Sequence, residues 1–155
     1  TGIRVSELVG IDLNDIDWEH NCIRIIRKGG NEDIVYFGDE LHRYLEDYIN
    51  YEREPGDDKE KALFVASRKD KGRLTVRSVE RIVSKYGTAT IPSKHLSPHS
   101  LRRTFGTNYY EETSDLYAVA DALGHKNIQV TKDHYADISE RKKQQVKEFS
   151  DKLLK

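Results

Sequence analysis

The chain carries the stretch PHSLRRT at residues 98–104, which predicts a helix with two reactive side chains on one face. Pro98 suits the first turn of a helix, and Ser97 suits the N-cap position before it. His99 and Arg102 lie three residues apart, so both side chains can reach one ligand. The buried face is predicted to hold the apolar residues at helical spacing, Leu101, Phe105 and Tyr109.

The motif LGH at residues 123–125 comes at the end of a second predicted helix. Asp115 suits the N-cap of this helix, and Gly124 is a natural C-terminal stop. His125 is therefore expected just past a helix end. The inward positions are predicted to be Leu116, Val119, Ala120 and Leu123.

The motif TKDHY at residues 131–135 lies in a third predicted helix, which Asn127 can cap and which reaches Tyr135. A last helix is predicted over residues 140–154. Its apolar positions can pack on the chain itself or on a neighbouring protomer, and both readings stay open: Val146, Phe149 and Leu153.

The chain starts with TGIRVSEL at residues 1–8, and a short helix is predicted from Arg4 to Val9. Two strand-like runs, residues 22–26 and 34–37, flank a loop that contains glycine, and they predict a β-hairpin. Lys28 is expected at or beside the tip of this hairpin.

Two more helices are predicted between the hairpin and residue 98. The first has Asp39 as a plausible N-cap and runs to about Glu54, and the second is capped by Thr75 and stopped by Gly87. The inner face of the second helix is predicted to hold Val76, Val79, Ile82, Val83 and Tyr86. The apolar run at residues 63–66 fits either element type. Together these elements indicate an α+β fold that is mostly helical, with a small antiparallel sheet near the N-terminus.

The length of 155 residues suits one domain with one core, and the hydrophobic fraction of 36% is enough to form it. The single cysteine, Cys22, excludes an internal disulfide framework and fits a reducing compartment. No apolar run is long enough for a membrane span, so a cytoplasmic protein is expected. Since the chain contains no methionine, we expect an upstream region before Thr1.

The formal net charge of −1 is low for a nucleic-acid binder, but the charges are unevenly distributed. Residues 68–85 contain seven basic and two acidic side chains, whereas residues 39–60 contain nine acidic and three basic ones. A polyanion can therefore lie on one face only. An ordinary solvated surface explains the same pattern, and charge alone does not choose between the two.

The order of the motifs resembles the catalytic domain of the tyrosine recombinases, the phage integrase family. The resemblance rests on T-G-x-R-x-S-E-L at the start, then H-x-x-R, L-G-H and a late tyrosine, and it spans almost the whole chain. It implies a covalent 3′-phosphotyrosine link to double-stranded DNA, which needs no metal and no cofactor.

The chemistry of these residue types agrees with that resemblance. A tyrosine hydroxyl has a pKa of about 10, so forming its phenolate near pH 7 costs about 4 kcal/mol without help. Arg4 and Arg102 suit a phosphate clamp because each guanidinium can hold two phosphate oxygens. Lys28 suits protonation of the leaving oxygen, and His99 and His125 can transfer protons or donate a hydrogen bond to the phosphate.

The resemblance assigns these roles more firmly. It implies that Arg4 and Arg102 hold the scissile phosphate, that Lys28 is the general acid, and that Glu7 supports the arginine region. It further implies that His99 assists proton removal from the nucleophile.

In the same family pattern His125 matches a histidine that hydrogen-bonds the phosphate. Tyr135 matches the tyrosine that becomes joined to the DNA.

Several alternatives remain open at this level. Arg24 or Arg27 can compete with Lys28 for its role. Four basic residues are either contacts to the DNA backbone or plain surface: Arg73, Arg77, Arg81 and Arg103. The remaining histidines are read as structural or surface residues: His20, His42, His95 and His134. His95 and His99 are four residues apart, but Pro98 argues against one shared helix, so no metal site is predicted.

The leading hypothesis is the catalytic domain of a site-specific recombinase or integrase over residues 1–155, without the N-terminal domain that clasps DNA in this family. A type IB topoisomerase uses related groups, but the short spacing and the L-G-H form favour a recombinase. An inactive regulatory relative is the third reading, and no reactive position is replaced in its favour. The expected partners are double-stranded DNA and further protomers in a tetrameric synapse, and no membrane.

Overall fold

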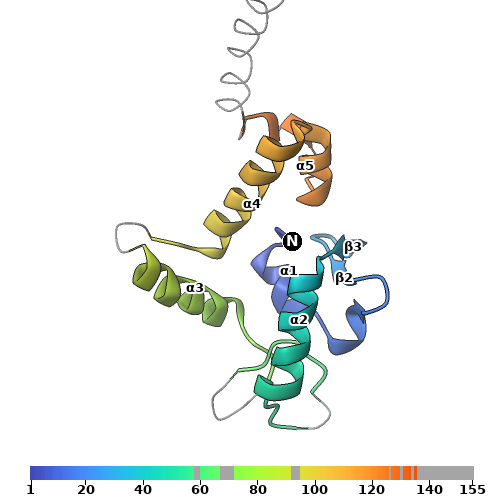
Figure 1. Ribbon diagram of the computed structural model, residues 1–155, viewed down its shortest axis with the longest axis vertical. Coiled ribbons are helices and arrows are strands. Elements are labelled where there is room, and N and C mark those ends of the chain that lie inside the picture. Colours follow the sequence, from blue (N-terminus) through green and yellow to red (C-terminus); the bar gives the residue numbers. More distant parts are fainter. Residues whose placement is uncertain are drawn as a thin grey trace, which may run out of the picture. The chain divides into compact units, whose positions relative to one another are not determined.

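The computed structural model describes residues 1–57, 60–66, 72–91, 95–125, 127–129, 131–133 and 135. The chain divides into two compact units, Thr1–Arg103 and Thr104–Lys155, and Figure 1 shows its helices and strands in chain order. Among the described residues each unit has its own buried apolar cluster, whereas the sequence predicts one core. Helix α4, Pro98–Thr113, contributes residues to both units.

The first unit is built on a small antiparallel sheet with the strand order β1-β2-β3. Its strands are β1 (Ile16–Asp17), β2 (Cys22–Ile26) and β3 (Glu32–Tyr36). Along β2, Ile23 and Ile25 face the core and Arg24 and Ile26 face outward, because successive side chains point to opposite sides of a strand. The predicted hairpin is confirmed.

A tight turn joins β2 to β3. The amide of Arg27 donates to the carbonyl of Asn31 at 2.8 Å, and the amide of Gly30 donates to the carbonyl of Arg27 at 3.0 Å. Gly29 and Gly30 have φ of 96° and 83°, a region that favours glycine. Lys28 lies exposed within this turn, as predicted.

Helix α1 (Val5–Gly10) packs against β2 and against α3, in agreement with the predicted short helix from Arg4 to Val9. It is followed by a 3₁₀ turn, η1, at Leu13–Asp15. The core of this unit is formed by apolar side chains from the sheet, α2 and two connecting segments: Ile11, Ile16, Ile23, Ile25, Val35, Phe37, Leu45 and Leu63.

Helix α2 (Asp39–Asp47) continues as a π-helical turn, η2, at Tyr48–Glu52, close to the predicted end near Glu54. The N-cap is Gly38 and not Asp39, since Asp39 is already helical and its carboxylate accepts from the side-chain Nδ2 of Asn21 at 3.1 Å. The run at residues 63–66 is neither helix nor regular strand, and isolated β-bridges join Ala62 to Asp12 and Val65 to Arg73.

Helix α3 (Val76–Thr90) is capped by Thr75, whose hydroxyl accepts from the Ser78 amide at 3.2 Å, as predicted. The predicted stop at Gly87 is wrong, because the helix continues for three more residues. Gly87 is instead buried where Leu96 passes closely, and a Cβ at this position would lie 2.6 Å from the Leu96 Cβ. The predicted inner face is wrong at Ile82 and Tyr86, which are 45% and 62% exposed because the described elements leave this side of α3 uncovered.

Helix α4 begins as predicted, with the Ser97 hydroxyl accepting from the Ser100 amide at 3.2 Å. Its buried face differs from the prediction, since Leu101 is 46% exposed while Gly106 and Tyr110 are buried. The buried face of the C-terminal half of α4 is thus displaced by one residue from the predicted one, and Phe105 and Tyr109 are only partly buried.

Helix α5 (Leu116–Ala122) is capped by Asp115, whose carboxylate accepts from the amides of Tyr117 and Ala118 at 2.8 and 3.1 Å. Gly124 has a φ of 58° just after the helix, as a C-terminal stop requires. The core of the second unit is formed by Tyr110, Val119, Leu123 and Tyr135.

Helical residues follow Asn127, whose side chain accepts from the Gln129 amide at 2.8 Å, so its predicted capping role is confirmed. The helix predicted over 140–154 lies outside the described residues. The prediction of a mostly helical α+β fold with a small antiparallel sheet is confirmed. No helix in the described ranges is long and apolar enough to cross a membrane.

Candidate active site

Arg4 occupies the N-cap of α1, and its position is tied to Glu7 in two ways. Its backbone amide donates to Glu7 Oε2 at 2.7 Å, and its guanidinium Nη1 donates to Glu7 Oε1 at 2.8 Å. The side chain of Glu7 is 2% exposed and that of Arg4 is 33% exposed, so the carboxylate of the pair is shielded from water while the guanidinium is partly accessible. The family resemblance implies that Glu7 supports the arginine region, and the two hydrogen bonds place its carboxylate against Arg4.

Arg102 also lies near the N-terminal end of α1, where Arg4 is the N-cap. Its guanidinium Nη1 donates to the carbonyl of Gly2 at 2.5 Å, across 100 residues of sequence. Gly2 comes two residues before Arg4, so the first unit gathers the predicted pair of arginines around one short segment. His99 is on the first turn of α4 and is exposed.

The hairpin distinguishes Lys28 from its two competitors. Arg24 donates to Asp15 Oδ1 at 2.7 Å and to Glu32 Oε1 at 3.4 Å, and the hydrogen bond and charge of Asp15 are the main causes that raise its pKa. A raised pKa keeps the guanidinium protonated and makes it a poorer acid. Arg27 is buried and bound to Glu7 and Asp33, whereas Lys28 is exposed. These contacts favour Lys28 as the proton donor.

His125 and Tyr135 belong to the second unit. His125 lies just past α5, where its ring Nδ1 is 2.9 Å from the hydroxyl of the fully buried Thr131. Tyr135 is 1% exposed, and its ring centroid is 5.7 Å from that of Tyr110. The backbone of Gly106 leaves the space in which the Tyr135 hydroxyl lies, because a Cβ there would be 2.0 Å from that oxygen.

The basic residues predicted to contact DNA have different surroundings. Arg73 donates to the carbonyls of Val9 and Ile11 at 2.8 and 3.2 Å and also binds the carboxylate of Asp12. Its guanidinium therefore stabilises the end of α1. The remaining three are exposed, two on α3 and one on α4: Arg77, Arg81 and Arg103.

The remaining histidines that the structure describes show no cation site. His20 is 2.9 Å from Asp17, and His42 is 2.6 Å from Asn21 and packs edge-on against Trp18. His95 is exposed. Within the described ranges no group of three histidine, cysteine or acidic side chains is arranged to hold a metal ion.

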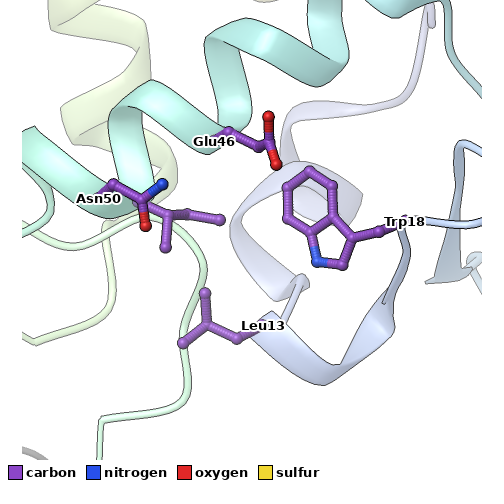
Figure 2. Close-up of a pocket in the computed structure, with 5 residues that line it drawn as sticks. Leu13, Trp18, Glu46 and Asn50 are labelled. Atoms are coloured by element: carbon purple, nitrogen blue, oxygen red, sulfur yellow. The ribbon is translucent and has the colours of Figure 1, made fainter.

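A cavity of about 370 Å³ lies elsewhere in the first unit. Leu13 and Trp18 line it from the turn region, and Glu46 and Asn50 line it from α2 and the following π-helical turn (Figure 2). Its lining contains none of the predicted reactive residues, so we do not assign it to the candidate site.

Comparison with known proteins decides the family. The model of the phage integrase family matches residues 1–142. The chain belongs to the phage integrase family. Tyrosine recombinase XerC of Corynebacterium glutamicum is 42% identical over 131 residues, which are 84% of this chain and 41% of the relative. Tyrosine recombinase XerC of Vibrio cholerae is 35% identical over 130 residues, again 84% of this chain and 41% of the relative.

Solved structures of the same family have the same fold. The XerA recombinase superposes with a TM-score of 0.77 at 28% identity, covering 86% of this chain and 48% of that one. The XerH site-specific recombinase, bound to a palindromic difH substrate in a post-cleavage complex, gives 0.74 at 25% identity, covering 94% and 42%. This integrase-family chain therefore spans less than half the length of these relatives.

The sequence did not predict two residues of this integrase-family chain as parts of the site. Arg27 was considered only as a competitor of Lys28, although the alternation of Ile23 and Ile25 already places position 27 on the buried face of β2. Gly106 carried no usable signal, since a glycine inside a predicted helix does not reveal which side chain needs its space.

Proposed function

We propose that the chain is the catalytic part of a site-specific recombinase or integrase that cleaves and rejoins double-stranded DNA through a 3′-phosphotyrosine. The observation that carries the proposal is the hydrogen bond from Arg102 to the Gly2 carbonyl, which brings Arg102 beside the segment that holds Arg4. The names and similarity of the relatives support the same function.

In the proposed reaction the Tyr135 oxygen attacks the scissile phosphorus, and the bond to the 5′ oxygen breaks. Arg4 and Arg102 neutralise the non-bridging oxygens, where charge builds up in the transition state. Lys28 gives a proton to the leaving 5′ oxygen, and His99 assists removal of the tyrosine proton. His125 donates a hydrogen bond to the phosphate, and Thr131 orients its ring from the other nitrogen.

Attack requires a rearrangement in the second unit, because Tyr135 is 1% exposed and packed against Tyr110. A phosphodiester in DNA cannot reach an oxygen that is enclosed in this way. We therefore propose that the structure represents a resting arrangement, from which the tyrosine is released before cleavage.

The proposed DNA-contacting residues are the exposed Arg77, Arg81 and Arg103, which can bind backbone phosphates. For Arg73 its contacts with α1 support a structural role instead. Further proposals are a tetrameric synapse of protomers on DNA, an additional N-terminal domain that clasps the DNA, and action in the cytoplasm.

The test uses nicked DNA duplexes with a randomised central region, since the recognised sequence is unknown. The protein should form an adduct that resists sodium dodecyl sulfate, and sequencing of the trapped DNA then supplies a defined substrate. Tyr135→Phe should abolish the adduct, whereas the matched control Tyr109→Phe, on a partly buried tyrosine of the same unit, should retain it. An undiminished adduct with Tyr135→Phe would reject the assignment of the nucleophile.

Plasmid assays separate the alternatives. Strand exchange between two copies of the enriched site supports a recombinase. Relaxation of supercoiled plasmids that lack the site would support a type IB topoisomerase instead, and binding without any adduct would support the inactive regulatory relative.

A further inference from the structure

We propose that Arg27 is a positioning residue for Lys28, and that Glu7 couples it to Arg4. This inference rests on the proposed function, since it concerns the general acid of the same reaction. Arg27 itself contacts neither the phosphate nor the nucleophile in the proposed reaction, and its task is to hold Lys28 in place.

Arg27 is one of the few charged residues that the described part of the chain buries. It is 8% exposed, and Glu7 beside it is 4% exposed. Its Nη1 lies 3.2 Å from Glu7 Oε2, and its Nε donates to Asp33 Oδ2 at 2.8 Å. A buried guanidinium requires such partners, and removing one leaves a charge in a poorly solvated place.

Glu7 connects this arginine to the predicted phosphate clamp. One oxygen of its carboxylate accepts from the Arg4 guanidinium at 2.8 Å, while the other lies next to Arg27. The hairpin and the N-terminus of α1 are therefore joined by a row of alternating charges, Arg4, Glu7, Arg27 and Asp33.

The backbone of Arg27 also closes the turn that carries Lys28. Its amide donates to Asn31, and its carbonyl accepts from Gly30. The side chain of Arg27 is thus bound to Glu7 of α1, and its main chain is bonded to Gly30 and Asn31 on the opposite side of the turn. Lys28 follows directly on this anchored residue, so its base is held relative to Arg4 although its own side chain is exposed.

This anchoring matters for proton transfer. A general acid must come within about 3 Å of the leaving oxygen, and a displacement of about 1 Å can slow a reaction roughly 10²-fold. An exposed turn with two glycines would otherwise move freely. The planar fork of an arginine binds two carboxylates at once, which the single nitrogen of a lysine cannot do in the same geometry.

The decisive experiment compares two substrates. One is the DNA site enriched by the wild-type protein, and the other has sulfur in place of the bridging 5′ oxygen at the cleaved bond. A thiolate leaves without a proton because a thiol is far more acidic than an alcohol, so the second substrate bypasses the general acid. Cleavage rates are measured for the wild type, Lys28→Ala, Arg27→Lys and Asp33→Asn. Arg102→Ala serves as a defect that lies outside proton donation.

The expected result is that Arg27→Lys slows cleavage of the normal DNA by about 10- to 10²-fold, and Asp33→Asn slows it less. The sulfur substrate should restore both variants, like Lys28→Ala, to within a few-fold of wild type, and should leave Arg102→Ala slow. Arg24→Ala is the matched control, because it removes an exposed arginine from β2, three residues before Arg27, and should cleave normally.

The inference is overturned if Arg27→Lys cleaves normal DNA at the wild-type rate, or if its defect persists on the sulfur substrate while that of Lys28→Ala disappears. Should Arg27→Lys not fold, as judged by circular dichroism, Asp33→Asn decides the matter by the same two criteria. Failure of the proposed cleavage chemistry has a different signature, since the wild-type protein would then form no adduct at all.

Discussion

Replacing Gly106 with alanine tests the packing of the proposed nucleophile. A Cβ on the present backbone would lie 2.0 Å from the Tyr135 hydroxyl oxygen, 3.2 Å from its Cζ and 2.9 Å from Leu123 Cδ1. Ordinary contact needs about 3.5 Å, so the hydroxyl must retreat by roughly 1.5 Å. Tyr135 is 1% exposed and packed against Tyr110, so a retreat of its ring disturbs buried neighbours.

The magnitude follows from two opposing effects. Overpacking a buried site costs about 1–3 kcal/mol, whereas alanine in place of glycine inside a helix such as α4 gains about 1 kcal/mol. The net loss of unfolding free energy for Gly106→Ala is therefore expected at about 0–2 kcal/mol. The single variant is less informative than its combination with Tyr135→Phe, which removes the oxygen that causes the closest contact.

A double-mutant cycle isolates the contact. Urea denaturation of the wild type, both single variants and the double variant gives four unfolding free energies. Gly106→Ala is compared in the wild-type background and in the Tyr135→Phe background. Effects present in both comparisons cancel, and these are the helix propensity of alanine and the contact with Leu123. Other contributions of the Tyr135 hydroxyl cancel in the same way, because Tyr135→Phe is compared with and without the alanine. We expect Gly106→Ala to be less costly in the Tyr135→Phe background by about 1 kcal/mol or more. If the two changes in unfolding free energy add within about 0.5 kcal/mol, the inferred packing of the Tyr135 hydroxyl against Gly106 is refuted.

Two further predictions concern charges in the first unit. Glu7→Gln should lower the unfolding free energy by about 3–5 kcal/mol, because it removes the anion between two arginines, while Glu32→Gln on the exposed side of β3 should change it by less than about 1 kcal/mol. Equal losses in urea denaturation would contradict the role of Glu7. The pKa of Asp17 is lowered by hydrogen bonds from the His20 amide and ring, so this carboxylate stabilises the fold above its unfolded pKa, and the contribution is lost as pH falls through the folded value. Asp17→Asn should therefore flatten the acid end of the curve of melting temperature against pH, and an unchanged curve would speak against that linkage.

Much of the local structure was predictable because it depends on neighbours in sequence. The β-hairpin followed from two apolar runs around glycines, and the caps at Thr75 and Asp115 followed from side chains that accept amide hydrogens within the next turn. The position of Lys28 on the turn followed from the same reasoning. Each of these features depends on contacts within a few residues.

The errors concern surroundings that the local pattern of residues does not show. Gly87 lies inside α3 and is buried against Leu96, and Ile82 is exposed because no described element covers it. For the site, the sequence motifs named Arg4 and Arg102 but could not show that a main-chain carbonyl connects their surroundings. The burial of Tyr135 could not be predicted either, because the sequence around this tyrosine does not indicate that Gly106 provides space for its hydroxyl.

The contact between Arg102 and the Gly2 carbonyl has a consequence for which substitutions the N-terminus tolerates. The acceptor is a main-chain oxygen, so no side-chain replacement at residue 2 can delete it. Gly2 has a φ of 67°, however, and a residue with a Cβ would favour a different torsion and turn the oxygen away. Position 2 is thus restricted by backbone conformation and position 102 by chemical identity, and the two restrictions protect the same hydrogen bond.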